Sequence, residues 1–325
     1  MKRKKILVEN KIPYMKGLLE PWADVDYMDP NFITRSAIKG YDALLVRTRT
    51  KCNEQLLEGS DVEFIGTATI GTDHIDMDYC QRKGITVRNA PGCNAPAVAQ
   101  WVLSTIGHWM QSCGVTDARG IKLGVGGVGH VGRIVARWAC EMGFSVILND
   151  PPLGLHDSVD GCDIITFHTP LTRDGQWPTW HMCDDAMLSR LTDCRLILNA
   201  SRGAVCDNEA LLRWGGDVAI DCWENEPDIN RELLESAFVA TPHIAGYSLQ
   251  GKMRGTAMMV QAVNEFYGFE GRIVMPSAPL YGVEHVTLKQ VMDSYNPLLE
   301  TTLLRKRPEM FEHMRNVYVL RPEVE

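Results

Sequence analysis

Three polar motifs in the middle of the chain contain residue types that could transfer a proton and bind a carboxylate. They are Asn-Ala-Ser-Arg-Gly at 199–203, Asp-Cys-Trp-Glu-Asn-Glu-Pro at 221–227 and Thr-Pro-His-Ile-Ala-Gly at 241–246. The planar fork of Arg202 matches a carboxylate. His243 can accept a proton near neutral pH, and Glu226 could orient its ring and stabilise its charged form.

Each of these residues also has an ordinary structural explanation. Arg202 could be a solvated surface charge, Glu226 could belong to a turn with Pro227, and His243 could be a buried histidine with satisfied hydrogen bonds. The place of the motifs in the sequence favours a catalytic role over these structural explanations, because each motif follows an apolar, strand-like run. Open α/β sheets place their ligand sites at the carboxyl ends of such strands.

A glycine-rich stretch upstream of these motifs predicts a dinucleotide site. Residues 121–150 read as strand, tight turn, helix and strand. Two glycine frames overlap, and the one beginning at Gly124 leaves a strand of barely three residues. We take the frame Gly127, Gly129, Gly132, which starts the helix near His130. These glycines would allow the turn, the approach of a pyrophosphate and close helix–strand packing, in that order.

An acid closes this unit. Asp150 ends the second strand, 18 residues after Gly132, where a carboxylate would bind a ribose diol. Backbone N–H groups at the start of the helix would meet the phosphates, whose charge the helix dipole favours. Asp150 would repel a 2′-phosphate, and Pro151 and Pro152 supply no cation, so we expect NAD to be preferred over NADP.

Composition narrows the class of protein. A length of 325 residues suggests about two domains. The net charge of −8 argues against a general nucleic-acid binder, and an anionic substrate would need a local basic site. Neither a signal peptide nor a membrane-spanning run is indicated. The ten cysteines form no CxxC pairs and do not alternate with histidines, so we expect no metal site, no disulfide framework and a cytoplasmic protein.

The rest of the chain alternates strand-like and helix-like patterns, which implies parallel sheets with helices on their faces. Apolar runs predict strands at 5–8, 43–46, 64–68, 85–88, 164–167, 196–198, 218–220 and 238–239. Helical patterns cover 76–83, 94–112 and 249–267. We expect Gly84 to stop the first, Asn94 to cap the second, which would connect two domains, and the third to return to the first domain.

In this order the motifs resemble those of the D-isomer-specific 2-hydroxyacid dehydrogenase family, from residue 1 to about 268. The resemblance implies an α/β fold of two doubly wound parallel-sheet domains, one Rossmann-type and one flavodoxin-like. Residues 1–93 and 247–268 would form the substrate domain and 94–246 the NAD-binding domain. Residues 269–325 would form a small C-terminal α+β dimerisation segment.

The resemblance also assigns roles to individual residues. Arg202, Glu226 and His243 would be catalytic, in NAD-dependent oxidation of a 2-hydroxy acid. The residues expected to contact the cofactor are Gly127, Gly129, His130, Val131, Gly132, Asp150, Thr169, Ala200, Ser201, Asp221 and Gly246. His168 would lie in a cofactor loop and would not act as a second base. Those expected to contact substrate are Arg47, Thr48, Arg49, Thr69 and Tyr247.

Three cations alternate after an early strand, at Arg47, Arg49 and Lys51. Alternating residues of an extended segment share a face, so they could converge on a phosphate, although they could also be a solvated strand end. We therefore expect a small phosphorylated 2-hydroxy acid as substrate. Alternatives are another 2-hydroxy acid, such as phosphoglycerate or glycerate, and a non-catalytic NADH-sensing protein, since the superfamily includes transcriptional co-repressors.

Three features depart from the family pattern, one of which is a C-terminal segment that looks abbreviated. Residues 151–163 are few and rich in Gly, Pro and Asp, where the family usually fits a helix, and residues 213–217 are also short. The tail has apolar residues at 274–279, Val286, Leu288 and 318–320, the last expected to be a strand, and a helical pattern at 308–315. It is too small to form its own core, so we expect it to pack against a second subunit in a homodimer.

Overall fold

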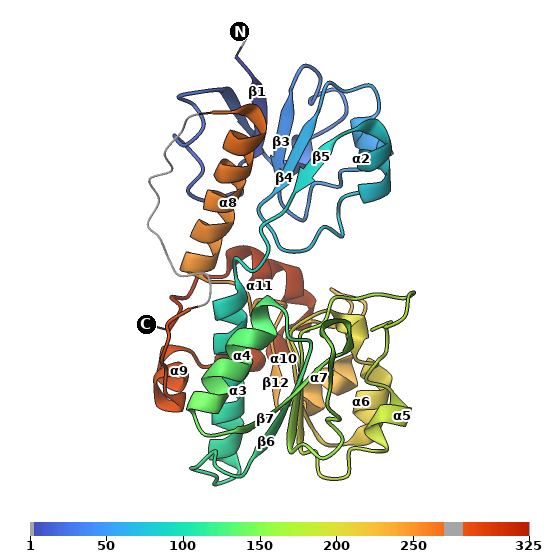
Figure 1. Cartoon of the computed structure of the whole chain (residues 1–325), viewed down its shortest axis with the longest axis vertical. Coiled ribbons are helices and arrows are strands. Elements are labelled where there is room, and N and C mark those ends of the chain that lie inside the picture. The colour runs from blue at the N-terminus through green and yellow to red at the C-terminus, as the bar shows by residue number, and fades with distance from the viewer. Residues whose placement is uncertain (1–2, 270–281, 325) are drawn as a thin grey trace. The chain divides into compact units, whose positions relative to one another are not determined.

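The computed structural model describes residues 3–269 and 282–324 (Figure 1). Internal contacts divide the chain into two units, residues 1–94 with 249–280 and residues 95–248 with 281–325. The sequence placed the boundaries at 93/94 and 246/247 and set a separate segment apart after 268. The contacts instead join residues 282–324 to the second unit.

The first unit contains a sheet with the strand order β2-β1-β3-β4-β5. Its strands are β1 (Lys5–Glu9), β2 (Asp24–Met28), β3 (Ala43–Val46), β4 (Phe64–Thr67) and β5 (Thr86–Arg88). All neighbouring pairs are parallel, which is the flavodoxin-like arrangement. Sequence reasoning missed β2, because this strand is half exposed and carries two aspartates instead of an apolar run.

Three helices accompany this sheet: α1 (Glu54–Leu57), α2 (Met77–Lys83) and α8 (Leu249–Tyr267). Asp76 caps α2 by accepting from Tyr79 N at 2.9 Å, and Gly84 ends it in the left-handed region at φ 70°. The buried face of α8 contributes Met259 and Val263 to a core shared with β1, β3 and β4. Figure 1 shows α8 beside the strands of this sheet. The return of α8 to the first unit is confirmed.

The second unit contains a sheet with the order β12-β11-β10-β9-β6-β7-β8. Its strands are β6 (Lys122–Gly126), β7 (Ser145–Asp150), β8 (Leu155–His156), β9 (Ile164–Phe167), β10 (Leu196–Asn199), β11 (Asp217–Ile220) and β12 (Val239–Ala240). All pairs are parallel except β7 with β8. The strand predicted at 238–239 begins one residue later than expected.

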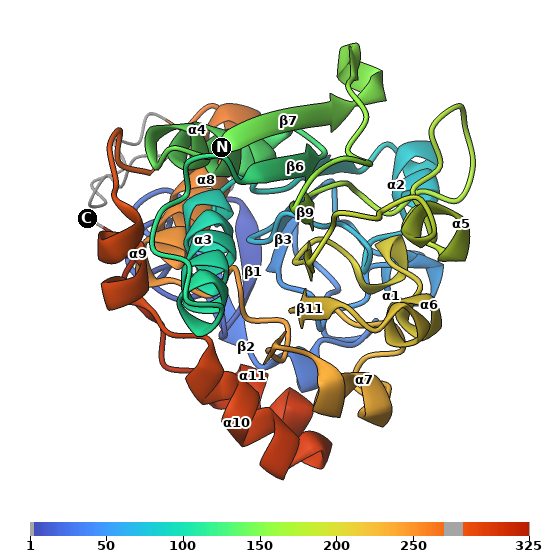
Figure 2. The same cartoon turned by 90° about the horizontal axis from the view of Figure 1, so that it is seen from below.

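Helices cover both faces of this sheet, as Figure 2 shows. They are α3 (Ala95–Ser112) and α4 (His130–Glu141) on one face, and α5 (Asp185–Leu188), α6 (Asn208–Trp214) and α7 (Arg231–Ser236) on the other. Trp101, Trp109 and Trp138 fill the core under α3 and α4. The doubly wound α/β prediction is confirmed.

The residues between β7 and β9 contain no α-helix, in agreement with the shortness of 151–163. A single 3-10 turn over Pro151–Leu153 and the two-residue β8 take its place.

The predicted cap of α3 is wrong. Asn94 Oδ1 is buried without a hydrogen-bond partner among the described residues. A capping side chain accepts a hydrogen bond from the backbone N–H of the second or third helical residue. The second helical residue of α3 is Pro96, which has no N–H.

The described part of the tail is helical, with α9 (Leu288–Ser294), α10 (Leu298–Lys306) and α11 (Phe311–Val317). The α+β prediction is wrong there, since residues 318–320 form no strand and only an isolated bridge joins Ser248 to Arg321. Val286 and Leu288 pack into the core of their own unit, so they are not the apolar surface expected for a partner. The extended run expected at 274–279 lies outside the described residues.

Among the described residues, no helix is long and apolar enough to cross a membrane.

Candidate active site

The three predicted catalytic residues follow three adjacent strands. Arg202 comes after β10, Glu226 after β11 and His243 after β12. These strands are neighbours and run parallel, so their carboxyl ends lie at one edge of the sheet. The structure thus brings the three loops to the edge where sequence reasoning placed them.

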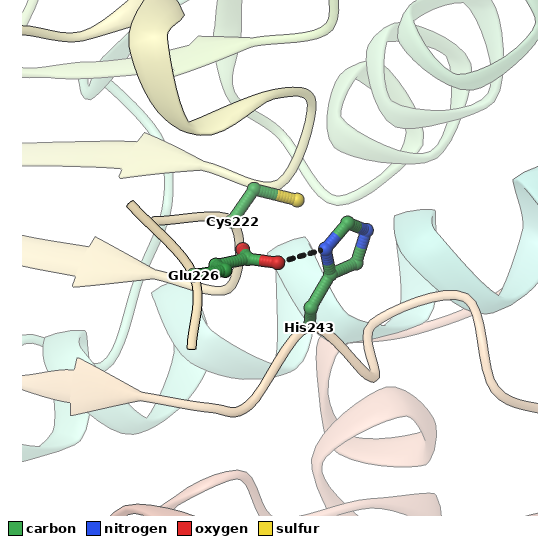
Figure 3. Close-up of side chains that lie close together, drawn as sticks. All are labelled: Cys222, Glu226 and His243. Carbon is green, nitrogen blue, oxygen red and sulfur yellow. Dashed lines mark hydrogen bonds and ion pairs between the residues drawn. The ribbon is translucent and has the colours of Figure 1, made fainter. Parts of the chain in front are cut away.

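Glu226 and His243 form a hydrogen-bonded pair, shown in Figure 3. The Nδ1 atom of His243 lies 2.8 Å from Oε2 of Glu226. The other carboxylate oxygen, Oε1, accepts from the backbone N–H of Trp223 at 2.7 Å. Side-chain exposure is 34% for His243 and 18% for Glu226, so the histidine can be reached from solvent while its partner is largely covered. With Nδ1 engaged, Nε2 is the ring atom available to a substrate.

A buried carboxylate holds the loop that carries His243. Asp221 is only 1% exposed. Its Oδ1 accepts from Thr241 Oγ1 at 2.6 Å and from Ile244 N at 2.7 Å, and its Oδ2 accepts from Ala245 N at 3.0 Å. The family resemblance places Asp221 near the cofactor, but these bonds give it a positioning role. His243 itself has φ 54°, a left-handed conformation that a non-glycine residue keeps only when its neighbours fix it.

The Arg202 loop is fixed in the same way. Asn199 accepts from Ser201 N at 3.1 Å and Oγ at 2.8 Å, and its amide donates to Arg202 O at 2.9 Å. A Cβ placed on Gly203 would lie 2.0 Å from Trp223 O, so only glycine allows this contact between the two catalytic loops. Arg202 is partly buried and donates to Ser201 O at 2.9 Å.

The environment shifts the pKa values of the pair toward an ion pair. Burial disfavours the charged ring of His243, but Cys222 and Glu226 favour it more strongly and raise the pKa of His243 well above its usual value. Burial would also raise the pKa of Glu226, yet the hydrogen bond and charge of His243 outweigh it and lower that pKa. Burial raises the pKa of Asp221 despite its hydrogen bonds.

The glycine turn fits a dinucleotide. Gly127 has φ 87°, and a Cβ on Gly132 would lie 2.0 Å from Gly127 O, so the helix packs against the turn as expected. A Cβ on Gly129 would meet nothing within 4 Å, which leaves open space at the residue meant to approach a pyrophosphate. Asp150 Oδ2 accepts from Val128 N at 2.7 Å, which places the expected ribose acid against the turn.

The other expected cofactor residues lie on loops and on one helix start in the same unit. His130 and Val131 open α4, after Gly129 in the position before its first residue. Thr169 follows β9, Ala200 and Ser201 follow β10, and Gly246 follows β12. Because all of these strands are parallel, the residues belong to the same edge of the sheet.

His168 was expected to lie beside the cofactor and not to act as a base. Burial lowers the pKa of His168 to about 3, so the ring is neutral at physiological pH. Its Nε2 lies 3.1 Å from Thr166 Oγ1, and its Nδ1 is buried without a hydrogen-bond partner among the described residues. A ring that stays neutral at physiological pH is consistent with the expectation that His168 lies in a cofactor loop and does not act as a second base.

The cation triplet in the first unit differs from the prediction. β3 ends at Val46, and Thr50 N donates to Arg47 O at 3.3 Å, so residues 47–50 form a turn. The assumption that Arg47, Arg49 and Lys51 alternate along an extended segment is therefore wrong. Arg47 is partly buried and its Nη1 donates to Lys11 O at 3.0 Å, whereas Arg49 and Lys51 are exposed.

The remaining expected substrate residues are divided between the units. Thr48 is exposed in the turn after β3. Thr69 follows β4, and its hydroxyl lies 2.6 Å from Thr67 Oγ1 and donates to Gly71 O at 2.9 Å. Tyr247 belongs to the second unit, where its ring meets Tyr318 edge-on at 6.0 Å.

Sequence reasoning missed one residue of this site, Arg321 in the C-terminal tail. It is 7% exposed, and its guanidinium lies 4.2 Å from the ring centroid of Tyr295. It donates to the carbonyls of Ile244 and Tyr247, each at 3.1 Å, and also to that of Ala245. It therefore holds the loop that carries His243, the predicted catalytic histidine. The only signal in the sequence is an arginine in a short tail, which no pattern distinguishes from a surface charge.

Comparison with known proteins identifies relatives along the whole chain. Residues 6–268 match the family described as D-isomer specific 2-hydroxyacid dehydrogenase, catalytic domain. A Bacteroides thetaiotaomicron protein named erythronate-4-phosphate dehydrogenase is 40% identical, over 98% of this chain and 97% of that protein. One of the same name from Porphyromonas gingivalis is 39% identical, over 97% and 92%. A solved NAD⁺-bound 3-phosphoglycerate dehydrogenase of Entamoeba histolytica shares the fold, with a TM-score of 0.69 at 22% identity over 84% of this chain and 99% of that one.

Proposed function

Because the chain belongs to the D-isomer specific 2-hydroxyacid dehydrogenase family, we propose that it oxidises 4-phospho-D-erythronate with NAD. The product is 2-oxo-3-hydroxy-4-phosphobutanoate, and the reaction is a step in pyridoxal 5′-phosphate (vitamin B6) biosynthesis. The observation that carries the chemistry is the 2.8 Å bond between His243 Nδ1 and Glu226 Oε2. The choice of substrate is supported by the two near-full-length relatives that bear this name.

The first unit supports the same substrate. The motifs Arg-Thr-Arg-Thr-Lys at 47–51, Thr-Ala-Thr-Ile-Gly-Thr-Asp-His-Ile-Asp at 67–76 and Ala-Pro-Gly-Cys-Asn at 90–94 are most like those of 4-phosphoerythronate dehydrogenase. Arg47 Nε is buried and has no hydrogen-bond partner among the described residues. A phosphate would satisfy this donor with a charge-assisted hydrogen bond.

Each catalytic residue has one task. Arg202 holds the substrate carboxylate with its planar fork. The Nε2 atom of His243 accepts the proton of the C2 hydroxyl, and Glu226 keeps the ring oriented and stabilises the charge that it gains. Asp221 keeps the His243 loop in place through its three hydrogen bonds. When bound, NAD supplies the hydride acceptor, held by the glycine turn and by Asp150.

The test is the formation of NADH, followed by absorbance, with 4-phosphoerythronate beside 3-phosphoglycerate, glycerate and unphosphorylated erythronate. We expect the phosphorylated four-carbon acid to give the highest kcat/KM. His243→Ala should lower the rate by about 10²–10⁴-fold, the usual effect of losing a general base, while NAD binding is kept. Arg202→Lys should also be severe, because a point charge does not replace the fork.

The same panel separates the alternatives. A higher kcat/KM for 3-phosphoglycerate or glycerate would identify a dehydrogenase of another 2-hydroxy acid. Tight NADH binding without turnover of any acid would favour a non-catalytic NADH-sensing protein.

A further inference from the structure

We propose that Cys222, Glu226 and His243 form a binding site for a thiophilic divalent cation such as Zn²⁺, and that the bound cation stops turnover. The inhibitory part rests on the proposed role of His243 as the base. The binding part rests on geometry alone.

The three side chains offer a thiol, a carboxylate and an imidazole in one place. Their ligand atoms all lie within 4.8 Å of one another. Figure 3 shows the thiol of Cys222 and the carboxylate of Glu226 directed toward the ring of His243. Cys222 is 2% exposed, so the thiol is enclosed by protein. Its Sγ also lies 3.9 Å from Oδ2 of Asp221.

This set matches the coordination chemistry of zinc. Zinc binds cysteine sulfur, histidine nitrogen and carboxylate oxygen, and three protein ligands leave a fourth tetrahedral position open. Tetrahedral zinc separates such ligands by about 3.3–3.8 Å, so the Nδ1–Oε2 distance of 2.8 Å must widen by roughly half an ångström. The backbone N–H of Trp223 is bonded to Oε1 of Glu226, the oxygen that the cation does not use.

Proton balance predicts the effect on catalysis. The charged form of the His243 ring carries protons on both Nδ1 and Nε2. Zinc takes the place of its Nδ1 proton and of the thiol proton of Cys222, and both displaced protons go to solvent. The coordinated ring is then a neutral imidazole that carries its remaining proton on Nε2. That nitrogen can no longer accept the proton of the substrate hydroxyl. Turnover should therefore stop, while NAD binding at the glycine turn around Gly129 is unaffected.

A second cluster in the same unit serves as a built-in control. His181, Asp207 and Glu224 also bring their ligand atoms within 4.8 Å of one another. It contains no thiol, and its carboxylates are already engaged. Asp207 Oδ1 accepts from two N–H groups at the start of α6, and Glu224 Oε2 accepts from Asn208 N at 3.0 Å. A thiophilic cation should prefer the cluster that contains Cys222.

The test titrates metal-free protein with Co²⁺, which reports a bound thiolate by a charge-transfer absorption band, and with Zn²⁺ by calorimetry. We expect the band in the wild type and in His181→Asn. We expect it also in Cys113→Ser and Cys140→Ser, which alter exposed thiols. Cys222→Ser should lose the band and weaken zinc binding by more than about 100-fold, because losing a mere supporting residue already costs 10–100-fold. Mg²⁺ should neither bind nor inhibit.

Several results would overturn the site. These are the absence of the band in the wild type, its survival in Cys222→Ser, or its loss in a variant of an exposed cysteine or of His181. If Cys222→Ser does not fold, zinc-edge X-ray absorption of the wild type decides, because the proposal requires one sulfur ligand beside nitrogen and oxygen.

Activity measurements separate this proposal from the proposed function. Metal-free protein without activity on any 2-hydroxy acid, but with the cobalt band intact, would refute the function and leave the cation site standing. Metal-free protein that turns over equally well with zinc bound would refute the inhibition. Tight NADH binding in the zinc-loaded protein is expected, and its loss would place the cation at the cofactor site instead.

Discussion

Replacing Arg321 by Met should damage both stability and catalysis, although the residue lies far along the chain from the catalytic motifs. The guanidinium donates to the carbonyls of Ala97, Ile244, Ala245 and Tyr247. Methionine fills similar space but donates nothing. Leaving one buried carbonyl unpaired costs about 1–3 kcal/mol. The carbonyl of Ile244 also accepts from Tyr247 N at 2.8 Å, and that of Ala97 lies within α3 and accepts from the next turn of the helix. The loss of the arginine donor therefore counts fully at Ala245 and Tyr247, and at the lower end of that range it lowers the free energy of unfolding by about 2 kcal/mol.

The loss of activity should exceed what the loss of folded protein explains. Freed carbonyls let the 243–247 loop move, and a misplacement of about 1 Å can lower a rate about 10²-fold. We therefore expect a fall in kcat of about 10–100-fold under conditions where the protein is fully folded. The affinity for NADH should change less than kcat, because Arg321 makes no hydrogen bond to the glycine turn among the described residues, and Gly246 is the one expected cofactor contact in the loop that it holds.

Urea unfolding measures the loss of stability. Steady-state kinetics measures the fall in kcat, and a fluorescence titration measures the affinity for NADH. Arg307→Met is a matched control, since Arg307 is an exposed arginine of the same tail. Arg321→Lys keeps the charge but not the planar fork, so its free energy of unfolding and its kcat should lie between those of the wild type and those of Arg321→Met. Near-normal stability and kcat in Arg321→Met would show that the tail does not hold the catalytic loop.

Four further predictions address the proton, the cofactor, the substrate and the assembly. Oxidation needs the neutral ring of His243, whose pKa is raised, so kcat/KM should rise with pH through that pKa. Glu226→Gln should move this rise to lower pH, and an unchanged profile would contradict the pairing. NAD should be used in preference to NADP because Asp150 repels a 2′-phosphate, and Asp150→Ala should reduce the preference in kcat/KM; equal use by the wild type would exclude this role. Arg47→Ala should weaken oxidation of 4-phosphoerythronate but leave erythronate nearly unchanged, whereas equal losses would mean that the residue only supports the fold. Leu303, 56% exposed on α10, should lie in a homodimer interface, so sedimentation at micromolar concentration should show a dimer in the wild type and a monomer in Leu303→Glu.

Much of the fold could be predicted because local signals and tertiary context agree. The strands at 43–46 and 164–167 are short, fully buried apolar runs, and the structure places them at those residues. The glycine unit was also predictable, since the positive φ of Gly127 and the close contact of Gly132 with Gly127 O are demands that a residue with a Cβ does not meet. Its helix begins at His130 as the chosen frame requires.

The errors arise where long-range contacts decide the structure. The strand β2 pairs through its backbone although its sequence is half polar. Residues 47–51 turn because the sheet ends at Val46, which the alternation of charges does not reveal. The tail was predicted to need a partner, but Val286 and Leu288 pack into the hydrophobic core of the second unit. Arg321 has a role only because residues far away in the sequence present acceptors to it, Gln100 221 residues earlier and the carbonyls of Ile244 and Tyr247.

The hydrogen bonds to Asp221 order the loop that carries His243 during folding, before any substrate binds. A left-handed conformation such as that of His243 raises the free energy by about 1–3 kcal/mol unless its surroundings hold it. Here the bonds from Thr241, Ile244 and Ala245 to one carboxylate hold it as part of folding. In the proposed mechanism the substrate then meets a base that is already oriented, and little of the binding free energy of the substrate is consumed in arranging the loop. If His243 is the base, as proposed, preorganisation of this kind makes Asp221 a determinant of the activation barrier through its hydrogen bonds to the loop.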